Sequence, residues 1–147
     1  MSVDTASPAR LAVGETFSRT ATLDAANIST FAKSVGDLNP LHHDPAYAKA
    51  TRFGGIIACG PQYASMLMGL VATHYAGDTA SVGLEFQFRF VRPVRAGDTI
   101  KLTWTVAAVD FNPKLKGDIV TLDGSITNQD AVEVLTSRGK VVVFRNG

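Results

Sequence analysis

The sequence predicts one α+β domain in which an antiparallel sheet wraps around a long helix. The longest nearly apolar stretch, Ile56 to Ala72, has the length of a buried helix. Apolar and polar residues alternate over 84–90 with the two-residue period of a strand that buries one face. Further strand-forming segments fill the rest of the chain, and helices and strands segregated in this way are typical of an α+β fold.

The first expected elements are an arm, a strand and a short helix. Residues 1–12 are rich in Ser, Ala and Pro without a period, which predicts a loose N-terminal arm before a domain at 13–147. The rough alternation from Glu15 to Thr22 predicts a strand. Asp24 is placed as the N-cap of a helix that ends at Gly36. Its apolar residues, spaced by three and four, are expected to face the core: Ile28, Phe31, Ala32 and Val35.

A loop and two helices come next. Asn39 and Pro40 are expected to keep the loop that starts at Asp37 out of helical geometry, because proline restricts itself and the residue before it. A second short helix is predicted from Pro45 to about Thr51. The long apolar helix is predicted from Pro61 to about Tyr75, since proline suits the first helical position.

Four strands are predicted in the second half. In the first of them, Leu84, Phe86, Phe88 and Phe90 are expected on the buried face, with Glu85, Gln87 and Arg89 on the solvent face. A turn from Pro93 to Asp98 precedes the second strand. The last three strands are predicted at Thr99 to Val109, Ile119 to Asn128 and Val132 to Phe144.

Composition limits the class of protein. The 147 residues, 46% of them hydrophobic, suit one domain that buries roughly 68–70% of its unfolded surface. With 14 Lys and Arg against 13 Asp and Glu, the net charge of +1 gives no reason to expect a nucleic-acid or membrane partner. Cys59 is the single cysteine, which excludes an internal disulfide, and no signal-peptide pattern is present, so a cytoplasmic location is expected.

The segment from Gly36 to Asp44 carries the residues best suited to chemistry. Asp37 and His42 place a carboxylate and an imidazole five residues apart across a stiffened loop, where both side chains can reach one water molecule. Histidine suits proton transfer because its charge changes near neutral pH. The alternative interpretation is structural: Asp37 caps a turn, His42 is a packed loop histidine, and His43 is solvated.

A longer pattern favours the chemical interpretation. Asp-Leu-Asn-Pro-Leu-His at 37–42, followed by Asp44, Phe53 and the segment 57–60, resembles the hydratase motif of the MaoC-like, R-specific enoyl-CoA hydratase family. The likeness continues through 90–98 and covers most of the chain. It implies a hot-dog fold, usually paired as a homodimer or a dimer of dimers with sites at the subunit boundary, and it implies that Asp37 and His42 activate water.

The resemblance also implies a substrate and a reaction. The substrate would be an acyl thioester, in particular an acyl-CoA, to which water is added or from which it is removed, with no cofactor or metal. The Gly60 amide at the start of the central helix would stabilise the developing negative charge on the thioester oxygen. Asn39 and Cys59 are the other residues expected to bind substrate. In the family pattern the catalytic histidine lies two residues after proline, which selects His42, and His43 falls at a variable position.

Departures from the family pattern leave alternatives open. Cys59, Gly60 and Pro61 stand where the family commonly has His-Gly-Met, and a cysteine near a helix N-terminus can act as a nucleophile, although a small buried thiol is the commoner case. The alternative functions are a hot-dog thioesterase and a non-catalytic subunit that binds acyl thioesters. His74, near the end of the central helix, is expected to interact with the helix dipole or to lie on the surface.

Overall fold

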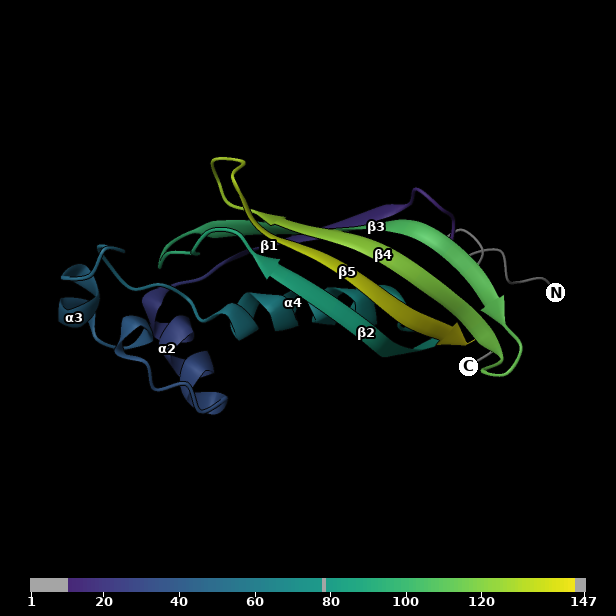
Figure 1. Cartoon of the computed structure of the whole chain (residues 1–147), viewed down its shortest axis with the longest axis horizontal. Coiled ribbons are helices and arrows are strands. Elements are labelled where there is room, and N and C mark those ends of the chain that lie inside the picture. Colours follow the sequence, from purple (N-terminus) through teal and green to yellow (C-terminus); the bar gives the residue numbers. More distant parts are fainter. Residues whose placement is uncertain (1–10, 78, 145–147) are drawn as a thin grey trace.

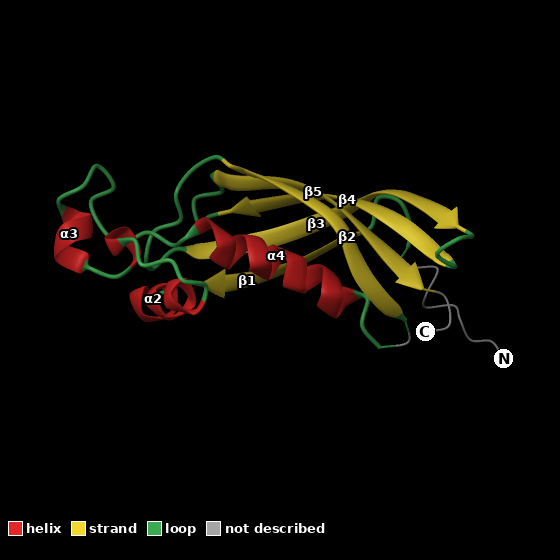
Figure 2. Cartoon of the chain, turned by 60° about the horizontal axis from the view of Figure 1, so that its bottom comes forward, coloured by secondary structure: helices red, strands yellow, loops and turns green. Residues whose placement is uncertain are grey.

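The structure is a computed structural model that describes residues 11–77 and 79–144. A curved five-stranded antiparallel sheet covers one side of helix α4 (Gly60–His74), as Figures 1 and 2 show. The strands pair in the order β1-β3-β4-β5-β2. Their bounds are β1 Thr16–Thr22, β2 Ala80–Phe90, β3 Thr99–Asn112, β4 Gly117–Thr127 and β5 Glu133–Phe144. The predicted α+β class is confirmed.

The expected N-terminal arm falls largely outside this description, because residues 1–10 are not part of it. Leu11 packs against the hydrophobic core. No helix within the described residues is both long enough and apolar enough to cross a membrane.

Two short helices, α2 (Ala25–Ser34) and α3 (Pro45–Lys49), lie beyond one end of the sheet, near the start of α4 (Figures 1 and 2). The predicted caps are present: the Asp24 side chain accepts a hydrogen bond from the Asn27 N–H, and Gly36 follows α2 with a φ of +79°. The buried apolar face of α2 is shorter than expected. Ile28 and Ala32 are fully buried, whereas Val35, the C-cap residue, is exposed.

The loop between α2 and α3 differs from the prediction in one respect. Residues Pro40–His42 form a single 3₁₀ turn, although the loop was expected to avoid helical geometry. Proline is compatible with the first position of a helical turn, and only the residue before it is excluded from the α region. Asn39 is that residue, with ψ of 122°, and its side chain caps the turn by accepting from the Leu41 N–H.

The core lies between α4 and the concave face of the sheet. Leu67 and Val71 of α4 are buried there, and Trp104 of β3 donates its indole N–H to the Leu67 carbonyl at 2.8 Å. Gly124 is paired with Trp104 in the β3–β4 register, and a Cβ at Gly124 would lie 2.6 Å from the indole ring. The missing side chain therefore makes room for the largest residue of the core.

The burial of strand β2 differs from the prediction of one buried face. Phe86 and Phe88 are half-buried, but Leu84 is 47% exposed and Phe90 is 51% exposed. The β2–β5 register shifts between Gly83 and Glu85, so Leu84 falls at an irregularity that interrupts the alternation. β2 is also an edge strand, so no further strand among residues 11–77 and 79–144 covers its open side.

Candidate active site

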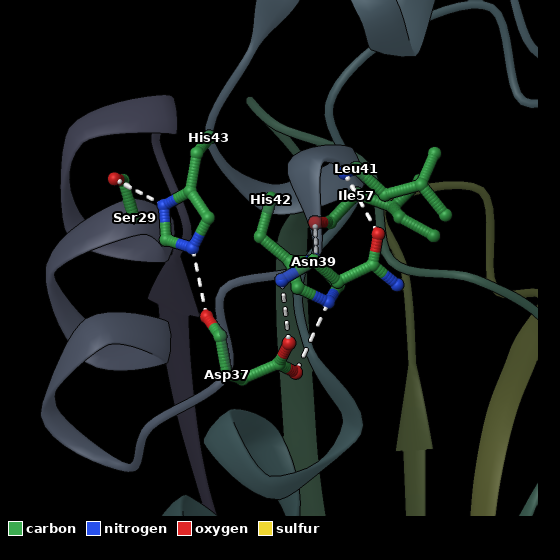
Figure 3. Close-up of polar contacts among 7 residues, drawn as sticks. All are labelled: Ser29, Asp37, Asn39, Leu41, His42, His43 and Ile57. Carbon is green, nitrogen blue, oxygen red and sulfur yellow. Dashed lines mark hydrogen bonds and ion pairs between the residues drawn. The ribbon is translucent and has the colours of Figure 1, made fainter.

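Asp37 and His42 meet in the loop between α2 and α3. Oδ2 of Asp37 lies 3.3 Å from Nε2 of His42, with the His42 side chain 8% exposed and the Asp37 side chain 32% exposed (Figure 3). The 3₁₀ turn between them shortens the path of the chain, so residues five apart in sequence face each other. The arrangement joins a buried imidazole to a carboxylate that solvent can reach.

The position of the His42 proton follows from its second contact. Nδ1 of His42 lies 2.7 Å from the carbonyl oxygen of Ile57, and a carbonyl can only accept a hydrogen bond. Nδ1 therefore carries a proton, and Nε2 is the ring nitrogen that can gain or lose one. That nitrogen is the one that faces Asp37.

The carboxylate of Asp37 is held on its other side by the loop backbone. Oδ1 of Asp37 accepts from the Asn39 N–H at 3.1 Å, and Oδ1 of Asn39 accepts from the Leu41 N–H at 3.1 Å. These successive side-chain turns are favoured by Asp and Asn. The structural role that the sequence left open for Asp37 is real, and it coexists with the contact to His42.

His43 is not solvated, which corrects the third part of the structural interpretation. Its ring is half-buried and makes two hydrogen bonds, with Oγ of Ser29 at 2.7 Å and with the backbone carbonyl of Asp37 at 2.8 Å (Figure 3). Ser29 was not among the residues predicted for the site. No signal in the local pattern points to it, because an isolated serine on a short helix has many structural explanations.

Cys59 lies at the N-cap of α4 and its thiol is buried. Burial raises the pKa of the Cys59 thiol, and the negative charge of Asp37 raises the same pKa further. A raised pKa keeps the thiol protonated at neutral pH, which argues against a nucleophilic Cys59.

Gly60 is the first residue of α4, one position earlier than predicted, and Pro61 is the second. The N–H groups of a first helical turn have no partner inside the helix, so the Gly60 N–H points out of the N-terminal end. The Phe90 ring covers Gly60 so closely that a Cβ there would lie 2.7 Å from Cε1 of the ring. A side chain at Gly60 would therefore fit only if the exposed Phe90 ring moved aside.

The chain thus brings Asp37, His42 and Asn39 together in one loop, and Cys59 next to Gly60 at the start of α4. His74 ends the same helix, about 20 Å away along its axis. There it lies 3.0 Å from Oε2 of Glu15 and stacks on Phe17, with 3.7 Å between the ring centroids. His74 is consequently a contact between α4 and the β1 region, remote from the Asp37 loop.

An antiparallel sheet curved around one long helix defines the hot-dog class of folds. Within that class, residues 9–125 match the MaoC like domain, and the chain belongs to the MaoC-like family. Both the fold and the family that the sequence predicted are confirmed.

Individual proteins are also similar to this chain. The chain is 34% identical over 99 residues to the (R)-specific enoyl-CoA hydratase of Aeromonas caviae, covering 67% of this chain and 73% of that protein. It is 32% identical over 124 residues to a protein of Streptomyces avermitilis named UPF0336 protein, covering 78% and 79%. The solved structure of the (R)-hydratase from A. caviae involved in PHA biosynthesis superposes with a TM-score of 0.81 at 31% identity, covering 89% of this chain and 96% of that one.

Proposed function

We propose that the protein is a hydro-lyase that adds water to a 2-enoyl thioester, or removes it from a 3-hydroxyacyl thioester, with coenzyme A as the carrier. One observation carries the proposal: Oδ2 of Asp37 and Nε2 of His42 face each other at 3.3 Å in a chain of the MaoC-like family. The similarity to an (R)-specific enoyl-CoA hydratase supports the choice of substrate.

The reaction needs two proton transfers, and the pair offers two groups for them. When water adds to the double bond, its oxygen bonds to C3 and the π electrons move toward C2 and the thioester oxygen. One proton leaves the water and one proton reaches C2, so the pair returns to its starting charge. Because the two groups are in contact, they act as one proton-exchanging unit. Nε2 is the His42 atom that takes part, since Nδ1 is occupied by the Ile57 carbonyl.

The developing negative charge needs a hydrogen-bond donor. In this proposal the Gly60 N–H donates to the thioester oxygen, helped by the partial positive charge at the start of α4. Cys59, the residue before Gly60, would place a neutral thiol beside the same thioester group. Asn39 uses its oxygen to cap the loop, which leaves its side-chain NH₂ to contact the substrate or its water.

The acyl chain needs an apolar groove, and one runs between α4 and β2. It has a volume of about 300 Å³, with walls that include Met68, Val71, Phe86 and Val141. Met68 lies about 12 Å along the helix axis from Gly60. A chain attached to a thioester at Gly60 would therefore extend along α4 toward this groove.

A second copy of the protein would close the groove. Exposed apolar side chains gather along the open edge of β2 and on the adjacent part of α4: Val82, Leu84, Phe90, Val91 and Met68. An apolar edge strand left open is an aggregation risk, and pairing with another copy removes it. We therefore propose a two-fold homodimer in which the β2 edges meet.

Two assays run side by side test the proposed reaction. The purified protein is mixed with a trans-2-enoyl-CoA, and loss of the enoyl absorbance is followed beside the release of free thiol. Loss of absorbance without thiol release supports hydration. Thiol release identifies a thioesterase, and binding of the thioester without either change identifies a non-catalytic subunit, so both results contradict the proposal. A panel of acyl lengths and branched acyl groups then defines the substrate.

A further inference from the structure

Ser29, His43 and the backbone of Asp37 form a hydrogen-bonded chain on the opposite side of Asp37 from the His42 ring (Figure 3). The Asp37 carbonyl only accepts, so Nε2 of His43 carries a proton. In the neutral ring Nδ1 is then an acceptor, and the Ser29 hydroxyl donates to it. The chain links helix α2 to the residue that carries the carboxylate.

Both backbone groups of Asp37 are held. Its N–H donates to the Ala32 carbonyl at 2.8 Å, which ties it to the end of α2, and its carbonyl accepts from His43 at 2.8 Å. Oδ1 is restrained by the Asn39 N–H. With the backbone fixed on both sides, only the side-chain torsions of Asp37 remain, and one carboxylate oxygen is already bound. These restraints direct the second carboxylate oxygen, Oδ2, toward His42.

Consecutive histidines thus contact different parts of one aspartate. The two rings are nearly perpendicular, at 80°, with centroids 6.2 Å apart. His42 faces the carboxylate and His43 holds the carbonyl, and their backbone-bound nitrogens differ: Nδ1 in His42 and Nε2 in His43. The nitrogen that must carry a proton therefore differs between the two neighbouring residues: it is Nδ1 in His42 and Nε2 in His43.

We propose that His43, supported by Ser29, is a positioning residue that holds Asp37 in place opposite His42. The inference rests on the proposed function, because only a reaction at the Asp37–His42 pair would depend on this placement. Misplacement of a reacting group by about 1 Å can cost on the order of a hundredfold in rate. A position that looks variable in the motif therefore contributes to the reaction in this chain.

Matched variants of His43 test the inference kinetically. His43→Phe keeps an aromatic ring and removes both hydrogen bonds, whereas His43→Gln keeps an N–H donor for the Asp37 carbonyl. We expect His43→Phe to lower kcat by about tenfold to a hundredfold with KM changed much less, and His43→Gln to recover most of that loss. Ser29→Ala should give an intermediate loss. Ser34→Ala is the control, since Ser34 is also on α2 but donates to the Phe31 carbonyl of its own helix.

Two kinetic outcomes overturn the inference. The first is a wild-type kcat in a folded His43→Phe protein. The second is an equal loss of kcat in the Phe and Gln variants, which would assign the effect to packing instead of the hydrogen bond to Asp37.

The ring nitrogens give a readout that needs no activity. Long-range ¹H–¹⁵N NMR spectra of the wild-type protein should place the proton on Nε2 of His43 and on Nδ1 of His42. Ser29→Ala should shift Nδ1 of His43 and leave His42 unchanged. Failure of this pattern overturns the inference whether or not the protein hydrates a thioester. A protein that shows the pattern but hydrates no enoyl thioester contradicts the proposed function alone.

Discussion

Single residues in the candidate site combine a structural contact with the contact proposed for chemistry. Asp37 caps the loop through Oδ1 and faces His42 through Oδ2, so one carboxylate has both a structural contact and a proposed chemical one. His42 is held through Nδ1, which leaves Nε2 for proton exchange. Variants at these two positions must therefore be checked for folding before their rates are interpreted.

Asp37→Asn and His42→Ala should each lower the hydration rate by about a hundredfold to ten-thousandfold, because each removes one member of an acid/base pair. The asparagine keeps an oxygen that can cap the Asn39 N–H, so Asp37→Asn isolates the chemical role. The rate of enoyl absorbance loss measures the effect, and circular dichroism checks the fold. His74→Gln, at the other end of α4, should keep near-normal turnover. A folded Asp37→Asn protein with the wild-type rate would rule out the acid/base role.

Cys59 should react slowly with iodoacetamide at neutral pH in the folded protein. Burial raises the pKa of its thiol, so a smaller fraction is thiolate than in an unfolded chain at the same pH. Mass spectrometry of the alkylated protein over time measures the rate, with the protein unfolded in denaturant as the reference. Alkylation as fast as in the unfolded chain would revive the nucleophile hypothesis.

At the scale of elements, the pairing of β3 with β4 places a small residue, Gly124, opposite the largest residue of the core, Trp104. Gly124→Ala should destabilise the protein by about 1–3 kcal/mol, because its Cβ would overlap the fully buried Trp104 ring. Chemical denaturation measures the free energy of unfolding. Gly55→Ala is the control, since nothing lies within 4 Å of a Cβ at that position. Equal stability of the two variants would mean that the indole can move aside.

Because the Tyr63 side chain of α4 is buried, we expect the protein to lose stability at alkaline pH. Burial raises the pKa of Tyr63 from 10.0 to about 12. The unfolded chain therefore loses this proton first, and the stabilising contribution, complete below pH 10, is lost as the pH rises to about 12. Two pKa units correspond to roughly 3 kcal/mol. Denaturation across this pH range measures the loss, and it should be smaller in Tyr63→Phe. An equal fall in the free energy of unfolding with pH in Tyr63→Phe and in the wild-type protein would contradict the prediction.

For the whole molecule, the exposed apolar edge of β2 predicts self-association. Sedimentation equilibrium at low micromolar concentration should show a dimer, and Leu84→Lys should weaken it, because the charge falls on the exposed edge. Val13→Lys changes an exposed apolar residue outside the proposed interface and should leave the dimer intact. A fully active wild-type monomer would contradict both the dimer and the closing of the acyl groove by a second copy.

Much of the molecule was predictable from sequence because its signals are local. The caps at Asp24 and Gly36, the apolar run of α4 and the succession of strands along the chain each depend on neighbours a few residues apart, and all are present in the structure. The α+β class follows from the order of these elements. The motif at 37–42 predicted that Asp37 and His42 face each other across one loop, as they do in the structure.

Tertiary structure decided what depends on distant partners. The Ile57 carbonyl fixes the proton of His42 across fifteen residues, and Ser29 binds His43 across fourteen. Neither contact leaves a trace in local periodicity, since hydrogen bonds across the fold are set by how α2, the loop and the start of α4 pack. The exposure of Leu84 has the same origin: alternation predicts which residues share a face of a regular strand, but only the register shift and the place of β2 at the sheet edge decide whether that face is covered.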